Sequence, residues 1–344
     1  MNIYGLTYDE LENIFIDMGS KKFHGNQLFS WLYEKRINSY DEATNIKKEL
    51  RAEIESKYSI DKLKIVNIEK DVDVVKYLFE LNDNEYIEAV LMRHDYGNSV
   101  CVSSQVGCNM GCKFCESGRR KKVRNLETYE MVLQILQIEE DLGERISHVV
   151  IMGIGEPFDN YDNVIKFIKI INHPKGLAIG ARHITVSTCG IVPKIEEFSN
   201  LELQVNLAIS LHAPNNTLRN KLMPINKVYP LEVLIPSLKE YIKKTNRRLT
   251  FEYILLEWIN DSIDNALELS KLVKGMNCYI NLIPYNETNN IEFKRSKTVQ
   301  IMRFYDILKK NRINVTIRRE FGSNISAACG QLRSKKEDLW NLFI

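Results

Sequence analysis

The sequence predicts an α/β fold in which a partial (β/α)6 barrel follows a small helical domain and a short β extension. Three stretches differ in their hydrophobic period. Apolar residues recur three to four positions apart in residues 1–60, alternate in residues 61–93, and form short runs between amphipathic segments in residues 94–324. Alternation of strands and helices is typical of βαβ units around a mostly parallel sheet. We assign residues 325–344 to a separate C-terminal segment.

The apolar spacing in residues 1–60, the helical domain, predicts three helices. Their patterns cover residues 9–16, 26–35 and 42–58. Two roles are open for this domain, because the residues favour neither: it packs against the rest of the chain, or it docks a nucleic acid.

The β extension of residues 61–93 predicts a hairpin. Two alternating runs, at residues 72–81 and 86–92, are separated by an Asn-Asp-Asn turn. Glu88 lies inside the second run between Ile87 and Ala89. Alternation alone is equally compatible with a solvent-facing carboxylate and with a buried one.

The barrel region predicts strands and helices in turn. The strands are expected at 149–152, 183–188, 204–211, 249–256, 278–283 and 313–318, and the helices at 160–172, 231–243, 262–274 and 296–311. In such barrels the chemistry lies at the carboxyl ends of the strands. Glycine and polar residues gather there at positions 153–156, 187–190, 210–212 and 281–286.

Three cysteines with C-x3-C-x2-C spacing, Cys108, Cys112 and Cys115, form the most informative motif. A loop with this spacing turns three thiolates toward one point, which suits an iron–sulfur cluster. Three ligands on a four-iron cluster leave one iron open for a substrate. The alternative, a closed structural zinc site, needs a fourth ligand, and His94 upstream has no paired cysteine knuckle.

Composition is that of an ordinary globular protein. The 344 residues are 44% hydrophobic and 27% charged, with a net charge of +2. No apolar run is long enough to cross a bilayer, and the N-terminus lacks the pattern of a signal peptide. Seven cysteines fit a reducing compartment. We therefore expect a cytoplasmic monomer that does not contact membranes.

The cysteine loop, with Phe114 before its third cysteine, resembles the radical S-adenosylmethionine (SAM) superfamily. Further blocks resemble the RlmN/Cfr family of 23S rRNA adenosine methyltransferases, and the helical start resembles that family's accessory domain. The blocks are CVSSQVGC at 101–108, RNL at 124–126, MGIGEP at 152–157, SLHAPN at 210–215, MPIN at 223–226, NLIPYN at 281–286 and AACGQL at 327–332.

The resemblance implies a radical-SAM barrel and methylation of an adenosine carbon, C2 or C8, in 23S rRNA and possibly tRNA. It implies one [4Fe–4S] cluster on the three cysteines, two SAM molecules per turnover, and flavodoxin or ferredoxin as electron donor. The residues that it assigns to SAM are Gly155, Glu156, Ser187, Ser210, Leu211, His212 and Asn286.

Three catalytic residues are also implied by the resemblance. Cys329 accepts a methyl group from one SAM, and a radical from a second SAM activates that methyl for addition to adenine. Glu88 removes the ring proton, and Cys101 releases the product by forming a transient disulfide with Cys329. We expect Cys278 to be a core residue and Cys189 to pack beside the SAM site.

Several alternatives stay open. Gly155-Glu156-Pro157 is more like the C2 enzymes, whereas residues 316–322 resemble the C8 branch, and the charged loop of residues 116–122 leaves substrate choice open. Basic clusters at 119–124, 243–248, 318–319 and 333–336 favour phosphate contacts. The other functions considered are a radical-SAM enzyme acting on a small molecule or peptide, and a non-catalytic iron–sulfur protein that binds RNA or senses redox state.

Overall fold

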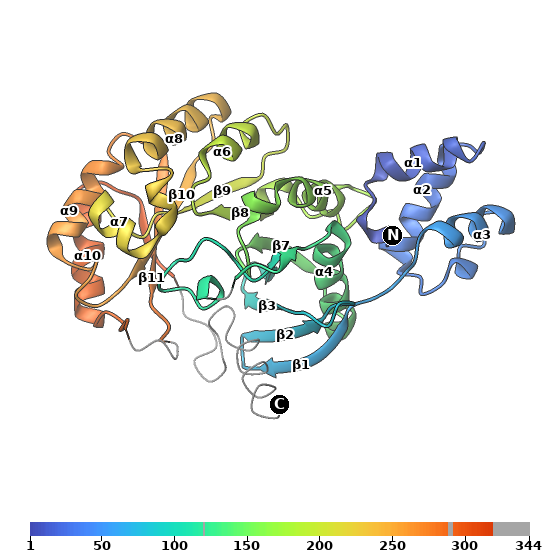
Figure 1. Cartoon of the computed structure of the whole chain (residues 1–344), viewed down its shortest axis with the longest axis horizontal. Coiled ribbons are helices and arrows are strands. Elements are labelled where there is room, and N and C mark those ends of the chain that lie inside the picture. The colour runs from blue at the N-terminus through green and yellow to red at the C-terminus, as the bar shows by residue number, and fades with distance from the viewer. Residues whose placement is uncertain (120, 288–291, 319–344) are drawn as a thin grey trace.

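A ten-stranded sheet forms the centre of the molecule (Figure 1). The structure is a computed structural model that describes residues 1–119, 121–287 and 292–318. In spatial order the strands are β1 (Lys64–Lys70), β2 (Val74–Glu80), β3 (Tyr86–His94), β4 (Gly97–Cys101), β7 (Ile146–Ile151), β8 (Ile184–Thr188), β9 (Asn206–Ser210), β10 (Leu249–Leu255), β11 (Cys278–Pro284) and β12 (Val315–Ile317).

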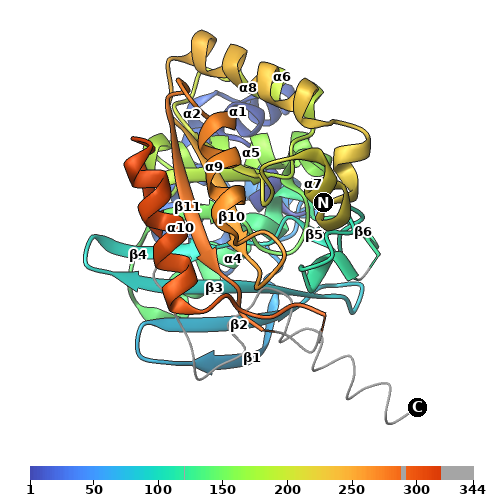
Figure 2. The same ribbon diagram turned by 90° about the vertical axis from the view of Figure 1, so that its left-hand side faces the viewer.

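The sheet has an antiparallel and a parallel part. Strands β1 to β4 pair antiparallel with one another, and from β4 through β12 each strand runs parallel to its neighbour. In Figure 2, β1 to β4 run across the view while β10 and β11 stand nearly upright, which shows how strongly the sheet twists. The predicted α/β barrel is confirmed, and the β extension continues the same sheet. A two-stranded ribbon of β5 (Gln105–Val106) and β6 (Arg124–Asn125) lies apart from it.

Helices cover the outer side of the curved sheet (Figure 1). They are α4 (Thr128–Leu142), α5 (Tyr161–Asn172), α6 (Val192–Phe198), α7 (Asn216–Leu222), α8 (Leu231–Thr245), α9 (Ile263–Leu272) and α10 (Thr298–Lys310). The predicted helices at 160–172, 231–243, 262–274 and 296–311 correspond to α5, α8, α9 and α10. Within the described residues, no helix combines the length and the apolar character needed to span a membrane.

Helix α4 was not among the predicted elements, and its buried polar residues explain why. Gln134 donates to the Ser103 carbonyl and accepts from the Ser103 amide, and Gln137 makes the same pair of bonds with Leu63. Glu139 accepts a hydrogen bond from the Ile146 amide. These side chains satisfy backbone groups of loops and strands, so they are buried without an amphipathic pattern.

The N-terminal domain is helical, as predicted. Its helices are α1 (Tyr8–Asp17), α2 (Phe23–Ser30), which continues into a π-helical turn (Trp31–Lys35), and α3 (Lys48–Lys57). The third helix begins at Lys48, later than the predicted residue 42, because a separate short turn occupies Tyr40–Glu42. Arg36 forms an ion pair with Glu139 of α4, and Lys166 of α5 pairs with Glu10 at 2.6 Å, so this domain docks on α4 and α5 (Figure 1).

Candidate active site

A cavity of about 360 Å³ gathers nearly all the residues singled out from the sequence. It is bounded by the cysteine loop, the carboxyl ends of the parallel strands, and one face of the β2–β3 hairpin. Leu211 is fully buried and is not among the lining residues, and Cys329 lies outside the described residues. The predicted residues that line the cavity are Glu88, Cys101, Cys108, Cys112, Cys115, Gly155, Glu156, Ser187, Ser210, His212 and Asn286.

The three loop cysteines share one wall of this cavity. Burial raises the pKa of the Cys108 thiol to about 12, and burial also raises the pKa values of Cys112 and Cys115. A buried thiolate is therefore unfavourable unless a metal centre compensates its charge. Thiols in this setting suit the role of metal ligands better than that of free nucleophiles.

Three thiols from one short loop are the ligand chemistry of an iron–sulfur cluster. Among the described residues, no three His, Cys, Asp or Glu side chains stand close enough to hold one metal ion. A cubane [4Fe–4S] cluster would accept each thiolate on a different iron. The three thiols fit that group by their chemistry and by their shared wall of the cavity.

The Gly-Ile-Gly-Glu turn after β7 forms the next part of the wall. Gly155 has a φ of +115°, and a Cβ there would lie 2.6 Å from the Cβ of Gln105, so only glycine fits. Glu156 accepts hydrogen bonds from the backbone amides of Phe158 at 3.0 Å and Cys189 at 2.8 Å. Burial nevertheless raises the pKa of its carboxyl. The backbone amide of Cys189 donates to this carboxylate, and Cys189 lines the cavity.

His212 is held as a neutral imidazole. Its Nδ1 accepts a hydrogen bond from the Ile254 amide at 3.0 Å, so the ring proton is assigned to Nε2. Burial, and then the charge of Arg219, lower its pKa to about 3. The ring meets Phe114 of the cysteine loop edge-on, with centroids 4.8 Å apart. His212 can therefore donate a hydrogen bond but cannot act as a cation at neutral pH.

Two buried residues at the carboxyl ends of the strands were missed in the sequence. Arg219 of α7 is fully buried and donates to the carbonyls of Cys189 at 2.7 Å and Leu211 at 3.3 Å, which ties the ends of β8 and β9 together. Glu252 of β10 lines the cavity and accepts a hydrogen bond from Asn281 of β11 at 2.8 Å. Burial raises the pKa of Glu252. Neither residue belongs to a local motif that would have revealed it.

The hairpin and the adjoining strand β4 contribute further predicted residues to the cavity wall. Glu88 is only 2% exposed, and its Oε2 lies 2.9 Å from Nζ of Lys76, which is fully buried. Cys101 pairs with Val90 at the end of β4; burial raises the pKa of its thiol, and the charge of Arg318 opposes this rise. Glu88 is thus buried, which decides between the two alternatives left by its sequence pattern. Lys76 was missed, although a lysine inside the apolar run of residues 74–79 was a usable signal.

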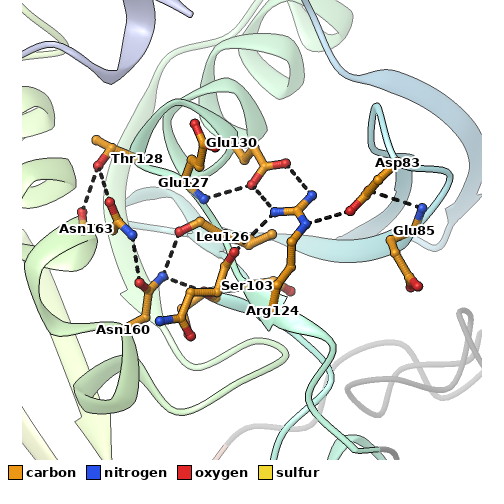
Figure 3. Close-up of polar contacts among 12 residues, drawn as sticks. Asp83, Glu85, Ser103, Arg124, Leu126, Glu127, Thr128, Glu130, Asn160 and Asn163 are labelled. Atoms are coloured by element: carbon orange, nitrogen blue, oxygen red, sulfur yellow. Dashed lines mark hydrogen bonds and ion pairs between the residues drawn. The ribbon is translucent and has the colours of Figure 1, made fainter. Parts of the chain in front are cut away.

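A polar network secures the hairpin to the barrel (Figure 3). Arg124 donates to both carboxylate oxygens of Glu130 at 2.8 Å and to Asp83 in the hairpin turn at 2.6 Å. Lys122 pairs with Asp159 at 2.7 Å. The charges of Arg124 and Lys122 are therefore compensated within the protein, and the expected phosphate contacts of the 119–124 cluster are not supported at these two positions. Arg319 and residues 333–336 lie outside the described residues.

Comparisons with known proteins agree with this arrangement. A model of the radical SAM superfamily matches residues 102–269, and a model of the ribosomal RNA large subunit methyltransferase N-terminal domain matches residues 1–60. A protein from Spiroplasma citri named probable dual-specificity RNA methyltransferase RlmN is 55% identical over 340 residues and 98% of each chain. The relative of the same name from Enterococcus faecalis is 54% identical over 97% of this chain and 96% of its own length.

A solved structure is similar over the same extent. The crystal structure of a radical SAM methyltransferase from Sphaerobacter thermophilus gives a TM-score of 0.90 at 40% identity, and the match covers 96% of this chain and 98% of that one. The resemblance noted in the sequence is thereby confirmed. Identity of this level over almost the full length shows that the chain belongs to the RlmN family within the radical SAM superfamily.

Proposed function

We propose that this protein methylates an adenosine carbon of RNA, C2 or C8, by radical-SAM chemistry. Its substrate is 23S rRNA and, in line with the dual specificity named for its relatives, a second RNA such as tRNA. The observation that carries the proposal is the single cavity that joins the three loop cysteines to Glu88 and Cys101 in a chain of the RlmN family. A general base and a second thiol beside a cluster loop suit carbon methylation, which ordinary methyl transfer cannot achieve.

The cofactor end of the cavity is formed by residues of the barrel. Cys108, Cys112 and Cys115 hold a [4Fe–4S] cluster, which with bound SAM supplies a radical able to abstract a hydrogen atom. Glu156 and the neutral His212 offer a hydrogen-bond acceptor and a donor to SAM beside the glycine turn. The other residues proposed to bind SAM are Gly155, Ser187, Ser210, Leu211 and Asn286, with Leu211 acting through its backbone.

The RNA end is formed by the hairpin and the C-terminal segment. Cys329 carries the methyl group, which it takes from one SAM, so each turnover consumes two. Glu88 takes the ring proton, and Cys101 attacks the sulfur of Cys329, which frees the methylated base and leaves a disulfide between the two cysteines. That disulfide must be reduced before the next turnover. Both sulfur steps require thiolates as nucleophiles.

The domains divide the work in this proposal. Residues 1–60 dock RNA, residues 61–93 deliver Glu88, residues 94–324 hold the cofactors, and residues 325–344 carry Cys329. The match of residues 1–60 to an rRNA methyltransferase N-terminal domain supports the docking role. The enzyme works as a monomer in the cytoplasm and takes electrons from flavodoxin or ferredoxin.

Nucleoside mass spectrometry of RNA from cells with and without the gene tests the proposal. Gene-dependent 2-methyladenosine identifies C2 as the target, and 8-methyladenosine identifies C8. Fractionation into rRNA and tRNA shows which RNA is modified. Absence of both nucleosides from every fraction would contradict the RNA substrate and favour a small-molecule or peptide substrate.

Replacement of Cys329 tests the methyl carrier. Cys329→Ala is expected to abolish RNA methylation by the reconstituted enzyme, because no other residue of the proposal carries the methyl group. Retained methylation in this variant would contradict the carrier role. A reconstituted wild-type protein that binds RNA but never cleaves SAM anaerobically would instead favour the non-catalytic alternative.

A further inference from the structure

A buried ion pair on the hairpin connects a lysine to the proposed general base. The register of the hairpin pairs Lys76 with Val90 and Leu78 with Glu88, so both charged side chains project from the same face. Val74, Val90 and Met92 of this face line the cavity. Nζ of Lys76 lies 2.9 Å from Oε2 of Glu88, with exposed fractions of 0% and 2%.

Such a pair is not explained by stability. Removing two charges from water costs several kcal/mol per ion, and apolar side chains of the same size often stabilise a fold equally well or better. Val74, Val90 and Met92 lie on the same face of the hairpin, so apolar side chains are also accommodated there. The cost is understandable if the site needs an ionised carboxylate in a buried place.

We propose that Lys76 is a positioning residue that keeps Glu88 ionised and aimed into the cavity. The inference rests on the proposed function, in which Glu88 removes the ring proton of the adenine. Glu88 lines the cavity whereas Lys76 does not, so the lysine acts through the carboxylate. Its ammonium group lies against the carboxylate and balances the negative charge in this buried place.

The proton transfer is chemically balanced. The ring C–H bond breaks, its electron pair stays in the adenine ring, and the proton moves to a carboxylate oxygen of Glu88, which becomes neutral. Lys76 keeps its own proton throughout. A Glu88 that is already protonated cannot accept the ring proton, so losing the lysine charge should slow this step specifically.

Three substitutions separate charge from shape. Lys76→Met removes the charge and the donor, Lys76→Gln keeps a donor without charge, and Lys76→Arg keeps the charge. Single-turnover methylation by the reconstituted enzyme is measured on 23S rRNA transcribed in vitro, with normal adenosine and with adenosine deuterated at C2 and C8. We expect Lys76→Met and Lys76→Gln to be slower by about 10- to 100-fold, less than the roughly 10²- to 10⁴-fold typical of losing a general base outright, because Glu88 itself remains. Lys76→Arg should recover most of the rate.

The isotope effect distinguishes positioning from general damage. In the slow variants the deuterium effect should equal or exceed that of the wild type, because proton removal limits the rate. A smaller isotope effect would show that another step had slowed, and rates within twofold of wild type would show that the lysine is dispensable. Either result overturns the inference, as does a Lys76→Arg enzyme as slow as Lys76→Met.

A matched control lies on β1, the strand that pairs with the hairpin. Lys64 pairs with Glu80 at 3.0 Å, but the lysine side chain is 72% exposed. Lys64→Met should leave rate and isotope effect unchanged. Thermal melts and iron content of each variant verify folding and cluster loading. If Lys76→Met fails to fold, Lys76→Gln is used as the variant without the charge. Failure of the proposed function is recognised separately, since the wild-type enzyme would then yield no methylated RNA to compare.

Discussion

The two ends of the cavity hold their charged and polar groups in different ways. At the barrel end, backbone amides hold these side chains by hydrogen bonds. Glu156 accepts from two backbone amides, and His212 accepts from the amide of Ile254. At the hairpin end, side chains support one another, as Lys76 and Glu88 do. Backbone partners survive substitution of a neighbour, whereas a side-chain partner is lost with it. The hairpin end should therefore be the more sensitive to single substitutions outside the cofactor ligands.

The largest expected effect is at the cysteine loop, where no backbone group can replace a lost ligand. Cys112→Ala should abolish cluster binding and methylation together, measured as iron content, visible absorbance and methylated nucleoside. Cys278→Ala is the matched control, because Cys278 is buried in the core away from the cavity lining. Full iron content in Cys112→Ala would contradict the assignment of Cys112 as a ligand.

The next effect is at the hairpin end. Glu88→Gln keeps the size of the side chain but removes the base, so methylation should fall by about 10²- to 10⁴-fold. Iron content should match the wild type, since Glu88 is not a ligand in this assignment. If the Glu88→Gln enzyme methylates RNA at a rate close to wild type, another group is the base.

Removal of Arg219 tests the backbone-held end. Arg219→Leu leaves the buried carbonyls of Cys189 and Leu211 without this donor, so we expect a loss of about 3 kcal/mol of unfolding free energy and weaker SAM binding. Urea unfolding and equilibrium binding of SAM measure the two effects. Lys221→Leu, an exposed position of the same helix, should change neither. Unchanged stability in the Arg219→Leu protein would show that these carbonyls find other donors.

The smallest effect concerns pH. Burial raises the pKa of Glu252 above its ordinary 4.5, so the folded state holds this proton more tightly than the unfolded chain. The contribution of Glu252 to stability is thus fully present below pH 4.5 and is lost as pH rises through the folded-state pKa. Glu252→Gln removes this loss, so its unfolding free energy relative to wild type should increase from pH 4.5 upward. Urea unfolding across pH checks this, and a difference that stays constant with pH would contradict it.

Site residues were predictable where their role depends on neighbours in the sequence, and not where it depends on partners far away in the sequence. Cys108, Cys112 and Cys115 lie within eight residues, so their spacing alone predicts a shared wall. Gly155 was recognisable for a similar reason, since its turn is a local feature. Lys76, Arg219 and Glu252 acquire their roles from partners on other elements, and only strand register and helix packing bring those partners into contact.

The fold shows the same division. Period-two and helical patterns predicted the hairpin, most of the parallel strands and four of the outer helices, because apolar residues recur in these segments at the spacing of a strand or a helix. Helix α4 escaped prediction because its buried glutamines and glutamates satisfy backbone groups elsewhere in the chain. The late start of α3 at Lys48 depends on a local turn that apolar spacing does not report.

The sequence by itself determined the α/β class, the cluster loop and the family, because these depend on local periodicity and on short motifs. Tertiary structure alone decided that Glu88 is buried, that a lysine two positions away on the cavity face of the neighbouring strand compensates it, and that Arg124 is engaged inside the protein. The physical reason is that the energetic effect of a charge depends on its surroundings. Dielectric environment and partner distance are properties of the folded chain, and a linear pattern does not contain them.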